Sequence, residues 1–203
     1  MPKRQRGTDK DRQRQRRRSI WSRPWVLWGG IGIGVVALIA GVITQSVITS
    51  GNITDFRLVA YGGQDKLGGD DILFTQVFDQ GKPVVLNFWA GLCPPCREEM
   101  PGFQRVSEEF AGEFVLVGVD IGPFVGLGSR ADARNLIDTL RITYPTAYAP
   151  NGGVVQDYLV QSMPTTIFMT PDQKIFERHS GFLPESQMRA KIQRLIAASS
   201  EPS

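Results

Sequence analysis

The chain has 203 residues, a net charge of +3, 41% hydrophobic residues and 21% charged residues, which suits one domain of ordinary size with appendages. The charge is uneven, because residues 1–23 carry ten lysines and arginines against two aspartates, whereas the remaining 180 residues carry 13 basic and 18 acidic side chains. The basic tail has little aromatic interleaving, so we expect no nucleic-acid partner.

An apolar segment follows the basic tail. No charged residue occurs between Arg23 and Asp55, and residues 24–43 contain no strongly polar side chain. Twenty such residues can cross the hydrocarbon core of a bilayer as a helix, and the preceding arginines would keep the N-terminus in the cytoplasm. The predicted organisation is a basic cytoplasmic tail over 1–23, a single-pass transmembrane anchor over 24–48, a linker over 49–54 and one extracytoplasmic domain over 55–200.

A cleavable signal peptide is the alternative for this segment. The apolar run is longer than the usual central region of a signal peptide, and no clear small-x-small cleavage pattern follows it. The sequence therefore favours an uncleaved anchor that places the chain in contact with membrane lipid.

The elements predicted after the linker alternate between strand and helix. In chain order they are a strand over 55–61, a short helix over 72–78, a strand over 83–90 that is buried on both faces, a helix after Cys93, a buried strand over 114–120, a helix over 130–141, an extended segment over 144–149, a short helix over 154–160, a hairpin over 165–178 and a final helix over 185–198. This order predicts an α/β domain with a mixed central sheet and helices on both faces.

The only two cysteines of the chain lie in the tetrapeptide Cys93-Pro94-Pro95-Cys96, between a predicted strand and a predicted helix. Two thiols at this spacing at a helix start can close a disulfide. The positive end of the helix macrodipole also stabilises a thiolate, which is the species that attacks disulfides. The motif therefore predicts a dithiol–disulfide exchange site.

Two other uses of the cysteines are chemically possible. A tetrahedral zinc site needs four ligands, but the chain offers two cysteines and the single histidine His179, so carboxylates would have to complete it. A structural disulfide that closes so short a loop removes little entropy from the unfolded chain. Both uses are disfavoured, and we expect neither a metal nor a cofactor.

The motif and its surroundings resemble a known family. The stretch from Trp89 through Cys93 and Cys96 to Pro101, the run at 81–90 and the downstream Met163-Pro164-Thr165-Thr166 look like the corresponding parts of membrane-anchored, thioredoxin-like thiol–disulfide oxidoreductases of bacterial envelopes, the TlpA/ResA-like proteins. The resemblance covers residues 53–200 and implies a thioredoxin-like fold. A Cys-x-x-Cys motif accompanied by these other matching stretches strongly indicates this family.

The resemblance also implies roles for individual residues. Cys93 matches the exposed nucleophile, Cys96 the more buried resolving cysteine, and Pro164 the cis-proline that faces them. Substrate would contact the residues around the motif and the backbone before the cis-proline, namely Trp89, Pro94, Pro95, Met163 and Pro164. Glu99 matches a glutamate near the cysteines that modulates proton movement, since a nearby carboxylate raises the pKa of a thiol; its alternative is a solvated helix face.

Several positions depart from the family pattern. Asn87 stands where thioredoxin itself has a buried aspartate, as is common in the envelope branch. Gly91 stands in place of a bulky residue, and Leu92 holds a position often taken by tryptophan, so the docking surface is expected to differ.

The remaining motifs are assigned no catalytic or ligand-binding role. Gly122, Gly126 and Gly128 fit neither the dinucleotide nor the P-loop pattern, so residues 122–128 are predicted to form a flexible connection. His179 could pair with Cys93 as in a cysteine protease, but it is interpreted as a surface histidine.

The direction of electron flow is predicted from what stabilises the thiolate. No histidine lies between the cysteines, and Pro94 and Pro95 remove two backbone donors, so the disulfide should be a weak oxidant and the protein a reductant. The resemblance implies disulfide- or dithiol-containing envelope proteins as partners, apocytochromes c among them, and a membrane protein as electron donor. The alternative function is binding and delivery of copper by the two thiols and Met163.

Overall fold

The computed structural model describes residues 53–200, so the predicted tail, the predicted anchor and most of the predicted linker lie outside the described residues. None of the helices formed by residues 53–200 has the length and apolar character needed to cross a bilayer. The strands are β1 (Arg57–Gly62), β2 (Asp71–Leu73), β3 (Val84–Trp89), β4 (Val115–Asp120), β5 (Thr146–Tyr148), β6 (Thr165–Met169) and β7 (Ile175–Ser180). The helices are α3 (Gln64–Leu67), the 3-10 helix η2 (Phe74–Gln80), α4 (Pro94–Glu109), α5 (Gly122–Val125), α6 (Arg130–Leu140), α7 (Gly153–Asp157) and α8 (Glu185–Ser200).

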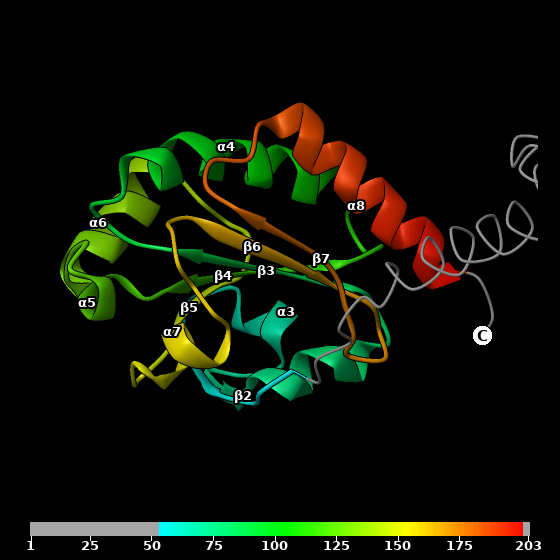
Figure 1. Ribbon diagram of the computed structural model, residues 1–203, viewed down its shortest axis with the longest axis horizontal. Helices are drawn as coiled ribbons and strands as arrows, with labels where there is room; N and C mark the ends of the chain where they lie inside the picture. Colours follow the sequence, from blue (N-terminus) through cyan, green and yellow to red (C-terminus); the bar gives the residue numbers. More distant parts are fainter. Residues whose placement is uncertain (1–52, 201–203) are drawn as a thin grey trace, which may run out of the picture. The chain divides into compact units, whose positions relative to one another are not determined.

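All seven described strands form one mixed sheet in the order β2-β1-β5-β4-β3-β6-β7. β3 pairs with β4, and β4 with β5, in parallel, whereas every other pairing is antiparallel. The central strand β3 therefore lies between a parallel and an antiparallel neighbour. Its carboxyl end, where Trp89 leads into the cysteine motif, lies at the end of the sheet nearer to α5 and α6 (Figure 1).

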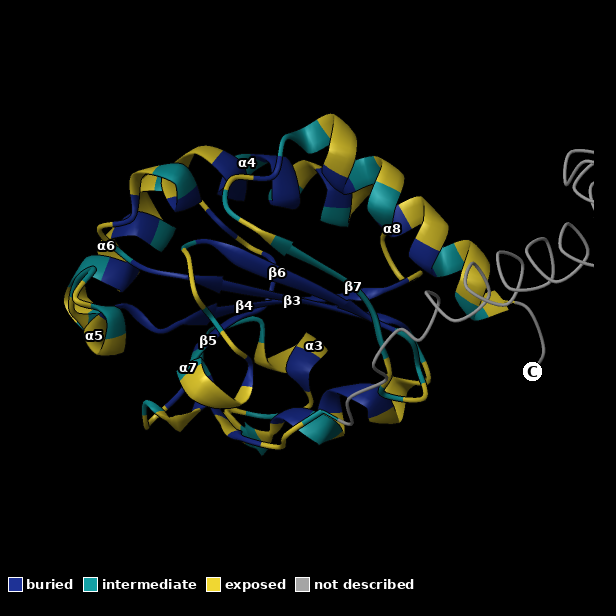
Figure 2. Cartoon of the chain, viewed as in Figure 1, coloured by how far each residue is buried: buried dark blue, intermediate teal, exposed yellow. Residues whose placement is uncertain are grey.

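Both faces of the central sheet are covered, as Figures 1 and 2 show. Every residue of β3 and β4 is buried, and because side chains alternate along a strand, each strand supplies two separate cores. One core contains Leu86 and Phe88 of β3 and packs against α3, η2 and α7. The other contains Val85 and Trp89 and packs against α4, α6 and α8. Burial on both faces of the sheet thus explains why residues 83–90 show no alternating hydrophobic pattern, as expected.

Helix α4 forms because its sequence supplies a start and an apolar stripe. Cys93 is its N-cap and the two prolines occupy its first turn, where a missing N–H is not needed. The buried positions of α4 recur at helical spacing and face the sheet, namely Cys96, Glu99, Met100, Gly102, Phe103 and Val106. This stripe fixes the start of α4 above the carboxyl end of β3.

The predicted α/β fold with a mixed sheet is confirmed, and two local predictions need correction. The helix predicted over 72–78 is confirmed from Phe74 onward as the 3-10 helix η2, but its first two residues belong to β2, because Ile72 pairs with Leu58 while Phe74, Val77 and Phe78 supply the buried helical spacing. The predicted flexible connection at 122–128 contains the short helix α5, which Gly126 ends in a left-handed conformation.

Candidate active site

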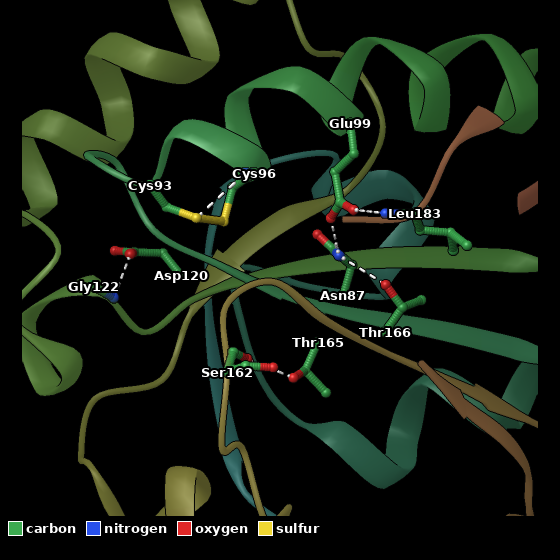
Figure 3. The surroundings of a disulfide bond; sticks show 10 residues. All are labelled: Asn87, Cys93, Cys96, Glu99, Asp120, Gly122, Ser162, Thr165, Thr166 and Leu183. Atoms are coloured by element: carbon green, nitrogen blue, oxygen red, sulfur yellow. Dashed lines mark hydrogen bonds between the residues drawn. A yellow bond between two sulfur atoms is a disulfide. The ribbon is translucent and has the colours of Figure 1, made fainter. Parts of the chain in front are cut away.

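The two cysteines form a disulfide at the N-terminus of α4 (Figure 3). Their Cα atoms are 5.3 Å apart. The Sγ atom of Cys93 accepts a hydrogen bond of 3.3 Å from the backbone N–H of Cys96. Because Pro94 and Pro95 have no N–H, Cys96 supplies the first free backbone donor of the helix. One donor of the first turn is thus directed at the sulfur.

An open groove of about 380 Å³ runs past the disulfide. Its lining contains no charged side chain and consists of Cys93, Pro94, Pro95, Val125, Leu127, Val160, Gln161, Ser162 and Met163. The expectation that Cys93 would be exposed is wrong, since its side chain and backbone together are only 2% exposed, against 0% for Cys96. Cys93 lines the groove together with the two prolines and with Val125 and Leu127 of the 122–128 segment.

The predicted substrate-contacting residues fall into two groups. Pro94, Pro95 and Met163 line the groove. The Met163–Pro164 peptide bond is cis, as the resemblance implied, but Pro164 is buried and lies outside the groove lining. Trp89 is also fully buried and packs behind the disulfide in the core beneath α4.

Glu99 is buried rather than solvated. It is 2% exposed, and its carboxylate turns toward the sheet, where Oε1 accepts a hydrogen bond of 2.8 Å from Nδ2 of Asn87. Oε2 accepts one of 3.1 Å from the backbone N–H of Leu183. Burial raises the pKa of Glu99 to about 7, and these two hydrogen bonds only partly oppose the rise. Glu99 therefore exchanges a proton near neutral pH, one helical turn from Cys96.

Asp120 is a site residue that the sequence interpretation missed. It ends β4 beside the disulfide (Figure 3) and is fully buried. Its Oδ1 accepts from the backbone N–H of Gly122, and its Oδ2 accepts from the Tyr61 hydroxyl and from Arg130, both at 2.9 Å. Arg130 also lies 4.1 Å from the ring centre of Tyr148. This buried ion pair ties the segment with α5, one wall of the groove, to the sheet.

The departure at Gly91 has a packing reason. A Cβ atom at Gly91 would lie 2.5 Å from the backbone nitrogen of Ala133, because the first turn of α6 packs directly on the glycine. A bulky residue there would displace α6. Leu92 donates its N–H to the carbonyl of Leu127 at 2.8 Å and leaves 60% of its surface exposed beside the motif.

The lone histidine lies on the edge strand β7, whereas the cysteine motif begins helix α4. His179 belongs to β7, where it pairs with Thr166 and contacts the carbonyl of Phe182. Within residues 53–200, no group of three or more His, Cys, Asp or Glu side chains gathers as a metal site would require.

The fold and the redox-capable cysteine pair define a thioredoxin-like domain. A family model for the AhpC/TSA family matches residues 52–178, more than half of the chain, and the chain belongs to this family. It is 30% identical over 132 residues to the thiol-disulfide oxidoreductase ResA of Halalkalibacterium halodurans, covering 65% of this chain and 71% of that protein.

Other relatives agree with this assignment. The thioredoxin-like protein YneN of Bacillus subtilis is 34% identical over 113 residues, covering 56% of this chain, and ResA of Oceanobacillus iheyensis is 36% identical over 107 residues, covering 51%. The chain spans 65% and 52% of the lengths of these two relatives.

Solved structures show the same fold. A protein assigned as the thiol:disulfide interchange protein DsbE of Chlorobium tepidum superposes with a TM-score of 0.59 at 24% identity, covering 74% of this chain and 96% of that one. The exposed lipoprotein thioredoxin of Streptococcus pneumoniae superposes with a TM-score of 0.56 at 25% identity, covering 70% and 99%.

Proposed function

We propose that this chain reduces disulfides of proteins outside the cytoplasm by thiol–disulfide exchange. The observation that carries the proposal is the Cys93–Cys96 disulfide, placed at the start of α4 and open to the uncharged groove. Because no charged side chain lines the groove, an extended polypeptide can approach the sulfur there without charge repulsion. The names of the relatives support the same chemistry.

The reaction begins from the dithiol form. The Cys93 thiolate attacks one sulfur of a substrate disulfide, so that a mixed disulfide forms and one substrate thiolate leaves. Cys96 then loses its proton and attacks the Cys93 sulfur, which releases the second substrate thiolate and closes the Cys93–Cys96 disulfide. Two electrons pass to the substrate, and an electron donor must return two electrons before the next turnover.

Glu99 supports the second attack. Cys96 is fully buried, and a buried thiol resists ionisation unless a base takes its proton. The carboxylate of Glu99 has a pKa of about 7 because it is buried, so near neutral pH it is basic enough to accept that proton and acidic enough to return it. Asn87 and Leu183 hold the carboxylate on the sheet side of α4.

The direction of electron flow follows from the weak stabilisation of the thiolate. Among residues 53–200, the N–H of Cys96 alone donates to the Cys93 sulfur, since the two prolines have no N–H to give. A poorly stabilised thiolate makes the disulfide a weak oxidant and the dithiol a good reductant. With a membrane anchor over 24–48, the domain would lie on the outer face of the membrane, act on envelope proteins including apocytochromes c, and take electrons from a membrane protein.

Replacing either cysteine by serine is expected to stop turnover, with a different intermediate in each case. Cys96→Ser keeps the attacking sulfur but cannot resolve the mixed disulfide, so it should accumulate a covalent adduct with disulfide-containing substrate, at up to one substrate per chain. Cys93→Ser should form no adduct. Insulin reduction measures turnover, and non-reducing electrophoresis detects the covalent adduct. Adducts formed through Cys96 in the Cys93→Ser protein would reverse the assigned roles.

A further inference from the structure

The turn between β5 and α7 contains an asparagine that is followed directly by a glycine. Asn151 precedes Gly152, whereas the other two asparagines within residues 53–200 each precede a large apolar residue. The side-chain carbonyl carbon of an asparagine can close a five-membered ring with the backbone nitrogen of the next residue. A side chain on that next residue hinders the attack, and glycine has none. The pair therefore carries an electrophile and an unhindered nucleophile in adjacent residues.

The fold leaves the reacting atoms of this pair accessible. Asn151 is exposed and Gly152 is partly buried. Among residues 53–200, no group accepts a hydrogen bond from the backbone N–H of Gly152, so its nitrogen can turn toward the asparagine without breaking one. Asn135, by contrast, lies inside α6, where the next N–H is held by the hydrogen bonds of the helix. Asn87 is fully buried in β3.

A hydrogen-bond donor is already directed at the oxygen on which negative charge would develop. The backbone N–H of Gly153 donates to Oδ1 of Asn151 at 3.2 Å. When a nitrogen attacks the amide carbon, the amide oxygen becomes an oxyanion, and a donor placed there beforehand stabilises the transition state. The turn thus supplies the electrophile, the nucleophile and the oxyanion donor from three consecutive residues.

We propose that Asn151 is a self-modification site, at which the side-chain amide is lost and a carboxylate is gained. The backbone nitrogen of Gly152 gives its proton to the solvent and bonds to Cγ of Asn151, which closes a succinimide ring. The bond between Cγ and Nδ2 then breaks, and this nitrogen takes up protons and leaves as ammonia. Water next adds to one of the two ring carbonyls and opens the ring, giving aspartate or isoaspartate. The reaction consumes one water and releases one ammonia, and no oxidant or reductant takes part.

The modified residue would lie next to the wall of the groove. A Cβ atom at Gly152 would lie 3.1 Å from Cδ1 of Phe124, so the glycine packs directly against α5. Val125, the next residue of α5, lines the groove together with Cys93. Isoaspartate adds one backbone carbon before Gly152, which then cannot keep both its place in the turn and its contact with Phe124. We expect the modification to loosen α5 and to lower the melting temperature.

The experiment stores the oxidised full-length protein at neutral pH and body temperature, both folded and unfolded in urea. Peptide mass spectrometry follows the change from amide to acid at each asparagine, and chromatography separates aspartate from isoaspartate. In the folded protein we expect conversion at Asn151, with isoaspartate among the products, and none at Asn87 or Asn135 over the same period. The rate at Asn151 should be comparable in the folded and unfolded samples, because the fold neither buries the pair nor removes the oxyanion donor.

Two results would overturn the proposal. The first is an intact Asn151 in the folded protein over a period in which the unfolded chain loses this amide, since the turn would then hold the reacting atoms apart. The second is aspartate without isoaspartate, because direct hydrolysis of the amide produces aspartate alone and involves no attack by Gly152.

Asn151→Ser is the matched control for the effect on the groove wall. The serine hydroxyl can accept the Gly153 N–H as the asparagine oxygen does, but it has no carbonyl carbon to attack. Storage should lower the melting temperature of the wild type and leave that of Asn151→Ser unchanged. An equal fall in both proteins would contradict the effect on α5. None of these readouts involves thiol–disulfide exchange, so their outcome is independent of the proposed function.

Discussion

Raising the pH from 4.5 to 7 should lower the free energy of unfolding of the oxidised protein by about 3 kcal/mol through Glu99 alone. The pKa of this carboxyl is about 7 in the folded protein and 4.5 as the ordinary value. Between these two pH values the folded state holds a proton that the unfolded state has lost. The free energy of unfolding therefore falls as the pH rises. The stabilising contribution of protonated Glu99 is fully present only below the pKa of the unfolded state.

Glu99→Gln should remove this pH dependence. Urea unfolding followed by circular dichroism at several pH values measures it, with Glu98→Gln as the control because Glu98 is an exposed carboxylate one position earlier on the same helix. The difference in stability between the wild type and Glu99→Gln should change by about 3 kcal/mol across the interval. Parallel stability profiles for these two proteins would show that Glu99 ionises normally and cannot serve as the proton acceptor for Cys96.

Replacing Asp120 by asparagine should destabilise the protein by about 3 kcal/mol. The carboxylate is fully buried, and its partner Arg130 retains 25% of its side-chain surface. Removing the carboxylate leaves the guanidinium largely desolvated and without its opposite charge, which is costly. Because Arg130 is partly exposed, we expect the lower end of the range seen for broken buried ion pairs.

A double-mutant cycle measures how much of this loss belongs to the pair. Removing the charge as well, in Asp120→Asn combined with Arg130→Met, should recover part of the stability, since no uncompensated ion then remains. Asp138→Asn, which changes an exposed residue on α6, is the control. Equal effects of Asp120→Asn and Asp138→Asn on the free energy of unfolding would mean that the Asp120–Arg130 ion pair does not stabilise the segment that forms the groove wall.

The fold could be predicted from hydrophobic pattern because its central strands are unusually clear. The continuous apolar runs at β3 and β4 can only be buried on both faces, and this fixes helices on both sides of the sheet. The start of the helix predicted over 72–78 was misplaced because a strand residue and helical spacing follow one another directly. Ile72 pairs as a strand, whereas the spacing of Phe74, Val77 and Phe78 is helical, and only the tertiary pairing decides between them.

The site could be predicted only where a local motif carries it. The disulfide could be predicted from two cysteines three residues apart at a helix start, whereas Glu99 was singled out by the resemblance to the TlpA/ResA-like proteins, because its spacing alone fits a solvated helix face equally well. The burial of Glu99 depends on Leu183, which is 84 residues distant, and no local pattern reports it. The Asp120–Arg130 pair was missed because an aspartate at the end of a buried strand is also an ordinary turn residue, and its partner comes from α6, the second helix after that strand. A polar residue that ends a fully buried strand was the available signal.

The reduction potential of the Cys93–Cys96 disulfide tests the central claim most directly. It can be measured by equilibrating the protein in dithiothreitol or glutathione buffers and following Trp89, which packs in the same core as both cysteines. A reductase with one backbone donor on its attacking sulfur is expected to have a potential near about −270 mV, as thioredoxin has. A value near about −120 mV would make the protein an oxidant of exported proteins and would contradict the proposed direction of electron flow.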